Sequence, residues 1–266
     1  MSNCQLKSSG AQKGFTLIEM SIVLVIIGLI IGGILKGQEI IDASRQKNFI
    51  SQVDALRSAV NTFADKYNGI PGDYDRAIAR INAQTANGTG DGIVGTANTT
   101  MANMLAQVGV GATAAAGTAT AAGEPQLFFC HLAQAGLIGG ASGDCATAAS
   151  FFGSGSPLPA LPYSQSGMTV AYGLAETADG NNDRVALWGR VHRGAAAAIA
   201  AGTSGVLSGR TMAQIDFKYD DGLPGLGNIR SAFAGTSAQC PIATAASAYV
   251  ATGEVPDCVA LIELVQ

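Results

Sequence analysis

An uninterrupted apolar run near the N-terminus constrains this chain most strongly. Residues 15–35 read FTLIEMSIVLVIIGLIIGGIL, and Glu19 is the one charged residue among them. A helix needs about 20 apolar residues to cross the roughly 30 Å hydrocarbon core of a bilayer. A secretory signal peptide would have a shorter apolar region followed by a small-residue cleavage site, whereas here the pattern after the run stays helical. The run therefore predicts a transmembrane helix at 15–35.

Glu19 is out of place in a simple membrane anchor. A carboxylate inside the hydrocarbon core costs at least about 2.5 kcal/mol unless it is neutralised or paired. An anchor gains nothing from this cost. A subunit that later meets a cation in the low-dielectric core of a filament can satisfy the charge between molecules. The sequence thus favours a helix that leaves the membrane to pack against copies of itself, and a plain anchor is the alternative.

The residues before and around Glu19 resemble a known processing motif. The string Lys13-Gly14-Phe15-Thr16-Leu17-Ile18-Glu19 is similar to the prepilin motif of type IV pilins and of the pseudopilins of type II secretion. The resemblance implies that a prepilin peptidase cuts between Gly14 and Phe15 and that the same enzyme methylates the new N-terminal Phe15. Residues 1–14 would then be a leader peptide that is removed.

The same resemblance implies roles for two further residues. Thr16 matches the usual second residue of mature pilins. Glu19 matches the fifth, which in that family pairs with the N-terminal amine of a neighbouring subunit during assembly. Lys36 departs from the family, because many pilins have a helix-loosening Pro there. Nearby glycines cost up to about 1 kcal/mol each in a helix and supply the same weakness, or they allow close helix packing. They are Gly28, Gly32, Gly33 and Gly37.

Past Lys36 the pattern becomes amphipathic. Apolar residues recur at alternating steps of four and three, which places them in one stripe on a helix. They are Phe49, Val53, Leu56, Val60, Phe63 and Tyr67. One helix is predicted over 15–68, roughly 80 Å long at 1.5 Å per residue, with a coiled coil as the secondary alternative. The string Asn68-Gly69-Ile70-Pro71-Gly72-Asp73 ends it, with Gly available for a left-handed cap. YNGIPGDY at 67–74 also resembles the turn after the helix in large pilin-like proteins.

The remaining residues, 69–266, predict one globular headgroup. Helices are expected at 101–108 and 127–137, and strands at 169–175, 184–191 and 212–219. The first two strands flank residues 179–183, which read as a hairpin turn. Stretches rich in Ala and Gly at 109–123 and 194–205 are expected to be surface inserts. With the resemblance, the pattern predicts an α+β, ladle-shaped pilin fold, in which a long helical stalk carries an antiparallel-sheet headgroup.

Four of the five cysteines lie outside the leader that holds Cys4. They are Cys130, Cys145, Cys240 and Cys258, and they allow three connectivities. The connectivity that pairs cysteines close together in the sequence joins Cys130 to Cys145 and Cys240 to Cys258. The second pair resembles the disulfide-closed C-terminal loop of type IV pilins. Free buried cysteines are the alternative, but an oxidising periplasm or cell exterior fits the even number better.

Few residues have the spacing of an active site. The chain has two histidines, His131 and His192, and neither lies in a metal-ligand motif. We expect His131 in a loop and His192 at the surface, and we predict no catalytic residue and no enzyme. Calcium is the one cofactor to weigh, because Asp179, Asn181 and Asp183 alternate oxygen-bearing side chains as a calcium loop does. A hairpin turn uses the same residue types for backbone reasons and is the preferred interpretation.

Other polar groups are interpreted as structural. Asn87, Thr89 and Asp91 repeat the calcium spacing loosely, and a further acidic group is Asp216, Asp220 and Asp221. Nucleic-acid binding is not supported, because the net charge is −4 and the arginines are dispersed, whereas single strands bind a basic, aromatic face. These arginines are Arg184, Arg190, Arg193, Arg210 and Arg230.

These observations predict a structural subunit of a type IV pilus-like filament. Its partners would be copies of itself, other pilins, the prepilin peptidase and methyltransferase, and an inner-membrane assembly machine. The precursor would be a single-pass protein of the bacterial inner membrane, and the filament an extracellular pilus or a periplasmic pseudopilus. A minor pilin or type II secretion pseudopilin is the alternative within the family. A membrane-tethered adhesin or binding protein is the alternative outside it.

Overall fold

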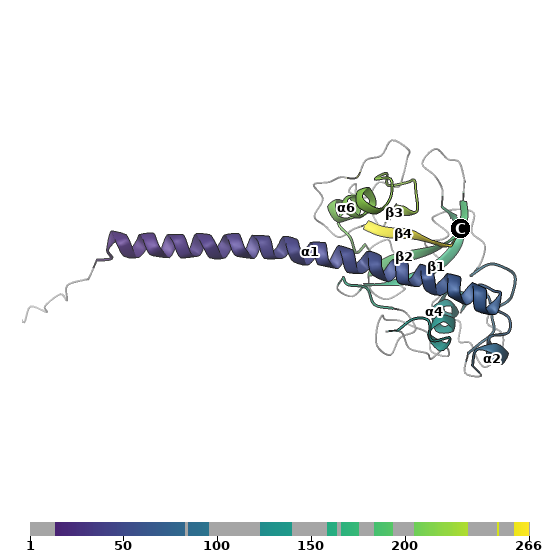
Figure 1. Ribbon diagram of the computed structural model, residues 1–266. Coiled ribbons are helices and arrows are strands. Elements are labelled where there is room, and N and C mark those ends of the chain that lie inside the picture. The colour runs from purple at the N-terminus through teal and green to yellow at the C-terminus, as the bar shows by residue number, and fades with distance from the viewer. Residues whose placement is uncertain are drawn as a thin grey trace, which may run out of the picture. The chain divides into compact units, whose positions relative to one another are not determined.

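The computed structural model describes residues 14–82, 85–95, 123–139, 159–163, 166–175, 184–193, 205–233, 249 and 258–265. Over these stretches helices and strands are grouped in an α+β arrangement (Figure 1). In chain order they are α1 (Leu17–Tyr67), α2 (Ala77–Arg80), α4 (Glu124–Gln134), β1 (Ser166–Ala175), β2 (Arg184–Arg193), α6 (Gly209–Tyr219), β3 (Ile229–Phe233) and β4 (Cys258–Val265). The helix predicted at 101–108 lies outside the described residues.

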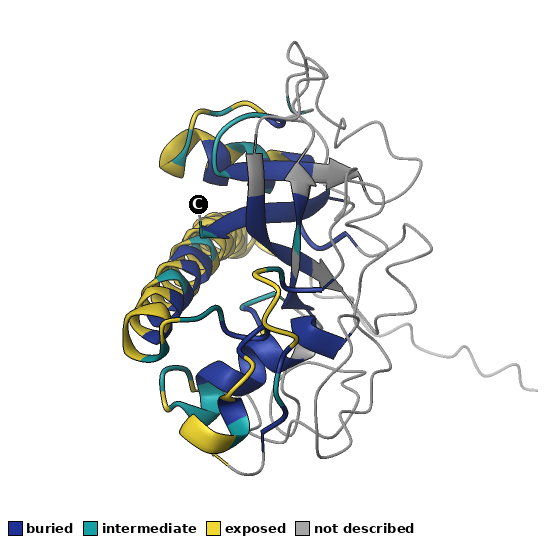
Figure 2. Cartoon of the chain, turned by 90° about the vertical axis from the view of Figure 1, so that its right-hand side faces the viewer, coloured by how far each residue is buried: buried dark blue, intermediate teal, exposed yellow. Residues whose placement is uncertain are grey.

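Helix α1 confirms the long helix that the apolar run and the amphipathic stripe predict. It continues for 51 residues, about 76 Å at 1.5 Å per residue. Contacts divide the chain into two compact units, Met1–Arg45 and Gln46–Gln266, and we call the second the headgroup unit. In the headgroup unit the inner face of α1 is buried and its outer face is exposed (Figure 2). The buried residues are Phe49, Ile50, Val53, Leu56, Ala59, Val60 and Phe63.

An antiparallel four-stranded sheet lies against this face of α1, in the order β1-β2-β4-β3. The β1–β2 pair confirms the predicted hairpin strands, and their register runs from Ser166 opposite Arg193 to Ala175 opposite Arg184. Strands β3 and β4 were not predicted from the sequence. The apolar C-terminal run CVALIELV is buried along nearly its whole length, so it lacks the alternating pattern that marks a half-exposed strand.

Alternate residues of the sheet face α1 and join its stripe in one hydrophobic core. They include Met168, Val170, Leu187, Val191, Ile229, Ala260, Ile262 and Leu264. The opposite face is buried as well but carries charge. Arg190 and Arg230 stand on either side of Leu261 across β2, β4 and β3, and each is 3% exposed. The Arg230 guanidinium lies 5.0 Å from the centre of the Trp188 ring.

The end of α1 uses a different residue from the one expected. Asn68, not Gly69, takes the left-handed conformation, with a φ of 53°. Asn is the residue other than Gly that most readily adopts it. Gly69 is needed for space instead, because a Cβ there would lie 2.7 Å from the Tyr74 ring. The turn thus brings Tyr74 onto the end of α1, where its ring packs edge-on against Phe63 at 6.0 Å.

The structure corrects two further sequence predictions. Residues 212–219 form helix α6, not a strand. Ile215, Phe217 and Tyr219 alternate as strand residues do, but Ser208 caps a helix by accepting a hydrogen bond from the Thr211 N–H at 3.2 Å. The helix buries Met212 and Ile215 and leaves Phe217 outside.

Helix α4 confirms the helix predicted at 127–137, shifted by three residues, but His131 is the second correction, because it is fully buried inside α4 and not in a loop. The Gly72 N–H donates to its Nδ1 at 3.0 Å. Its Nε2 lies 2.8 Å from the Ala86 carbonyl oxygen, so Nε2 carries the proton and donates. The ring thus holds the turn after α1 and the loop after α2 together.

Candidate processing and assembly site

The residues of the predicted cleavage site lie immediately before α1. Gly14, Phe15 and Thr16 are non-helical, and the helix begins at Leu17. The Thr16 N–H donates to the Glu19 Oε2 at 2.8 Å, and the Thr16 hydroxyl donates to the same oxygen at 2.8 Å. The Glu19 N–H in turn donates to the Thr16 Oγ1 at 3.3 Å. This reciprocal pattern is a capping box, and Thr16-Leu17-Ile18-Glu19 has its S/T-x-x-E signature.

The capping box adds a role for Glu19 that the sequence analysis missed, although its signature was readable. The first N–H groups of a helix have no partner inside the helix, and the carboxylate satisfies one of them. The box also sets the first turn of the helix directly after Phe15, which leaves the Gly14–Phe15 bond outside the helix. Phe15 is 80% exposed. The arrangement presents an accessible peptide bond followed at once by a rigid helix.

Among the residues that the structure describes, none covers the segment after the capping box. Large apolar side chains from Leu17 to Ile41 are exposed, Leu17 by 88% and Leu29 by 73%. By length and composition α1 can cross a membrane, and its most apolar window has none of its residues buried. So much continuous apolar surface in water marks a site for lipid or for another protein.

A second polar centre lies in the headgroup unit, where Asp73, Asp91 and Glu124 approach each other closely enough to bind a metal ion. Asp73 is 5% exposed and Glu124 is fully buried. Asp73 accepts backbone hydrogen bonds from Gly90, Asp91 and Gly92 at 2.7 to 2.9 Å. Burial raises the pKa of both Asp73 and Glu124, and the hydrogen bonds to each oppose that shift.

These contacts make the carboxylates anchors of the loop at 85–95. Glu124 binds the middle and the C-terminal end of this loop, accepting from the Thr89 N–H and from the Gly95 N–H, each at 2.8 Å. The loosely spaced calcium candidates are likewise engaged: Asn87 accepts from the Ile78 N–H at 2.9 Å and Asp91 from the Ile93 N–H at 3.0 Å. Asp and Asn side chains fold such turns without a metal. The chemistry that this cluster supports is loop closure.

The acidic group on and after α6 is also engaged with backbone. Asp220 accepts from the Asn228 N–H at 2.5 Å and from the Ile229 N–H at 2.6 Å. Asp216 is buried and accepts from the Tyr249 hydroxyl at 2.6 Å. Burial is the main cause that raises the pKa of Asp216 to about 6.

Other predicted site residues fall as follows. Cys130, in α4, and Cys258, in β4, are both disulfide-bonded. Cys145 and Cys240 lie outside the described residues, so the pairing stays a prediction, as do the calcium candidates at 179–183. Of the dispersed arginines, Arg190 and Arg230 are buried in the sheet and Arg210 is exposed. Arg184, His192 and Arg193 lie at the ends of β2.

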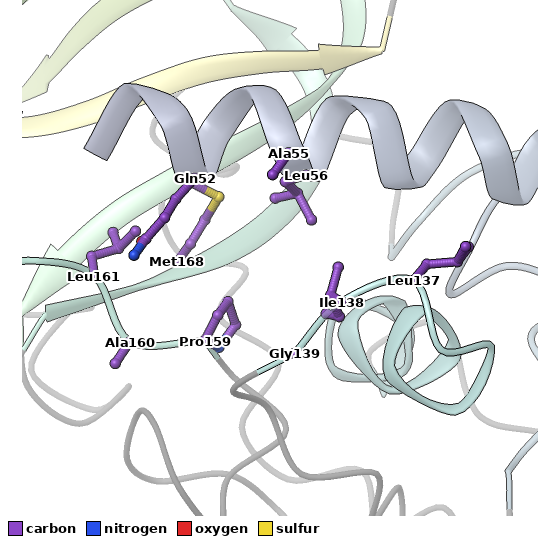
Figure 3. A pocket seen from close by; sticks show the side chains of 10 residues that line it. All are labelled: Gln52, Ala55, Leu56, Leu137, Ile138, Gly139, Pro159, Ala160, Leu161 and Met168. Carbon is purple, nitrogen blue, oxygen red and sulfur yellow. The ribbon is translucent and has the colours of Figure 1, made fainter. Parts of the chain in front are cut away.

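A groove of about 540 Å³ lies beside α1 in the headgroup unit (Figure 3). Gln52, Ala55 and Leu56 on α1 and Met168 on β1 line one part of it, and residues 137–139 and 159–161 line the rest. None of these lining residues is titratable. The groove therefore offers no acid, base or nucleophile, and it suits an apolar group.

Comparison with known proteins singles out the N-terminal segment. Residues 10–35 match the family model of the prokaryotic N-terminal methylation motif, which is the signature of type IV pilins and pseudopilins. No curated protein and no solved structure matches the chain. The match contains the capping box and the exposed apolar residues up to Leu35. The chain therefore carries the N-terminus of a pilin-like or pseudopilin substrate of prepilin peptidase, and the apolar helix is that of a membrane-anchored precursor.

Proposed function

We propose that this protein is a structural subunit of a type IV pilus-like filament, without an active site of its own. The supporting observation is the uncovered apolar surface of α1 between Leu17 and Ile41. Lipid covers the predicted span in the precursor. After cleavage before Phe15, copies of the same helix replace the lipid in the filament core.

Glu19 makes this exchange depend on cleavage of the leader. In the precursor its carboxylate is satisfied by Thr16. One carboxylate offers about four acceptor positions, so Glu19 can also receive the ammonium group that cleavage creates on Phe15 of a neighbouring subunit. The pair is a charge-assisted hydrogen bond in a low-dielectric core, which is stronger than a neutral one. The leader blocks it, because Phe15 then has no free amine.

Two substitutions separate the charge of Glu19 from its capping role. Glu19→Gln keeps the capping box, since Gln serves at that position, but it removes the charge. Glu19→Ala removes both. Glu39→Ala is the matched control, because Glu39 is an exposed acid on α1 that forms a surface ion pair with Lys36.

The measurement is negative-stain imaging of sheared surface filaments, with mass spectrometry of the main band. We expect wild-type filaments built of chains that begin at N-methyl-Phe15. We expect Glu19→Gln and Glu19→Ala to be processed normally and to form no filaments, and Glu39→Ala to form them. Normal assembly of Glu19→Ala would contradict the pairing. A mature protein that still contains Lys13-Gly14-Phe15 would favour a tethered binding protein instead.

A further inference from the structure

The outer side of α6 carries an apolar side chain that no described residue of the headgroup unit covers. Arg210, Gln214, Phe217 and Lys218 share the exposed side of the helix. Phe217 is 83% exposed. A Cβ added at Gly222 would lie 3.3 Å from the Phe217 Cδ2, so the ring lies beside the loop that continues into the exposed Leu223. We call Phe217, Gly222 and Leu223 the α6 patch.

The patch is distinctive within the headgroup unit. Among the described residues of the headgroup unit, the exposed large hydrophobic ones are Phe217, Tyr219 and Leu223. All three belong to α6 or to the loop after it. Tyr219 is covered on one side by Lys218, whose Nζ lies 5.2 Å from the ring centre. The fold also does not need Phe217, because Met212 and Ile215 already anchor α6 to the core.

The position of α6 indicates what covers the patch. Gln46 Nε2 on α1 donates to Gln214 Oε1 on α6 at 2.8 Å, one helical turn before Phe217. Gln46 is the first residue of the headgroup unit and follows directly on Arg45, the last residue of the unit that holds the assembly segment. The α6 patch is therefore on the element that is hydrogen-bonded to α1 where the helix enters the headgroup.

Size argues for a second copy of the chain over a free partner. A stable complex between separate proteins buries about 1,200 Å² or more, and one Phe and one Leu provide only a fraction of that area. Copies that are already held by their N-terminal helices meet at a high effective concentration, so even a small contact forms. In a filament the same contact is repeated at every subunit.

We propose that the α6 patch, with Phe217 as its anchor, is a headgroup contact between neighbouring copies of this chain in the filament. The inference rests on the proposed function, and it adds a second interface to the one made by the N-terminal helices. The Phe217 ring leaves water against the neighbouring headgroup and stabilises the assembled state without affecting processing or membrane insertion.

Photocrosslinking of the full chain in cells tests the contact directly. Phe217 is replaced by p-benzoyl-phenylalanine, which keeps an aromatic ring at this position, and filaments are irradiated and then sheared off. We expect a covalent dimer whose linked peptides both come from this chain. The same replacement at Asp65, which is exposed near the other end of the headgroup part of α1, is the comparison. Filaments without a dimer at position 217, or with an adduct to a different protein, would overturn the proposal.

Substitutions give an independent measurement. We expect Phe217→Ser to be cleaved and methylated at Phe15 like the wild type, but to lower the recovery of sheared filaments by about tenfold or more, because an anchor is lost at every subunit. Phe217→Leu should recover most of the yield, and Asp65→Ser should match the wild type. Wild-type recovery and heat resistance of Phe217→Ser filaments would refute the contact. If the wild-type chain forms no filaments, the proposed function fails first, and that outcome differs from filaments that form without the α6 contact.

Discussion

Two buried groups of the headgroup unit, His131 and Asp216, should give its stability opposing dependences on pH. Burial lowers the pKa of His131 from 6.5 to about 4, because the imidazole cannot be charged without losing its solvation. Burial raises the pKa of Asp216 from 3.8 to about 6. In each case the folded protein favours the neutral form, but the neutral form is the deprotonated one for His131 and the protonated one for Asp216.

The sign follows from proton uptake. Between pH 6.5 and about 4 the unfolded chain binds a proton at His131 and the folded chain does not, so the free energy of unfolding falls on acidification. At about 1.4 kcal/mol per pH unit the loss in the free energy of unfolding reaches about 3 kcal/mol. Between pH 6 and 3.8 the folded chain holds a proton at Asp216 that the unfolded chain has released. This raises stability on acidification, by at most about 3 kcal/mol and by less where water screens the carboxyl.

Single substitutions should reveal each contribution. Asp216→Asn removes the gain in stability on acidification, so the stability of this variant should fall more steeply than that of the wild type between pH 6 and 4. His131→Gln removes the loss of stability on acidification, so the stability of this variant should rise as the pH falls over the same range. Asp73 and Glu124, whose pKa values are also raised, act in the same direction as Asp216. His131→Gln is expected to be less stable than the wild type at neutral pH. This does not affect the test, because the test compares the slopes of stability against pH.

The assay is urea unfolding of the full chain in detergent and EDTA, followed by tryptophan fluorescence. The chain has a single tryptophan. This residue, Trp188, is fully buried in β2, so its emission reports the headgroup unit. Parallel pH curves for the wild type and both variants between pH 4 and 6.5 would refute the reasoning, because neither group would then differ between the folded and unfolded states.

Three further predictions concern packing, backbone geometry and calcium. Phe63→Ala should cost about 3 to 5 kcal/mol by denaturant unfolding, because Phe63 is fully buried among the rings of Tyr67, Tyr74 and His131. The exposed neighbour Asp65→Ala should change stability by less than about 0.5 kcal/mol. Gly227→Ala should destabilise by at least about 1 kcal/mol, because Gly227 has a φ of 70° and a Cβ there would meet the Asp220 carboxylate. Gly139→Ala, where nothing lies within 4 Å of the added atom, is its control, and an equal loss in both would contradict the steric account. Adding calcium should leave the thermal midpoint within about 1 °C, because a ligand raises it only by binding the folded state and Asp73 and Glu124 already accept backbone hydrogen bonds. A saturable rise that Asp91→Asn abolishes would show a calcium site.

Long helices were predictable from the sequence because their signals are local and repeated. The stripe from Phe49 to Phe63 recurs over several turns, and the structure buries it as expected. The hairpin strands were readable for the same reason, since β1 and β2 follow one another along the chain. The capping box of Thr16 and Glu19 was equally local, and only its overlap with the processing motif hid it.

Short elements with mixed signals were not predictable. In 212–219 the alternation of Ile215, Phe217 and Tyr219 favoured a strand, and tertiary packing of Met212 and Ile215 overruled it. His131 gave no sign of its role, because its partners, Gly72 and Ala86, are distant in the sequence. The same holds for Asp73 and Glu124, which share Thr89 across the fold.

The sequence by itself determined the N-terminal segment of this protein: the apolar helix, the cleavage motif and the lone Glu19 all lie within one short stretch and act through neighbours in the chain. The tertiary structure alone decided the headgroup, from the buried carboxylates that close a loop to the helix that leaves Phe217 exposed. The physical reason is the distance along the chain between the residues that interact. Helix periodicity and capping are satisfied by residues three or four positions apart, whereas burial and the partners of buried polar groups depend on segments that only the folded chain brings together.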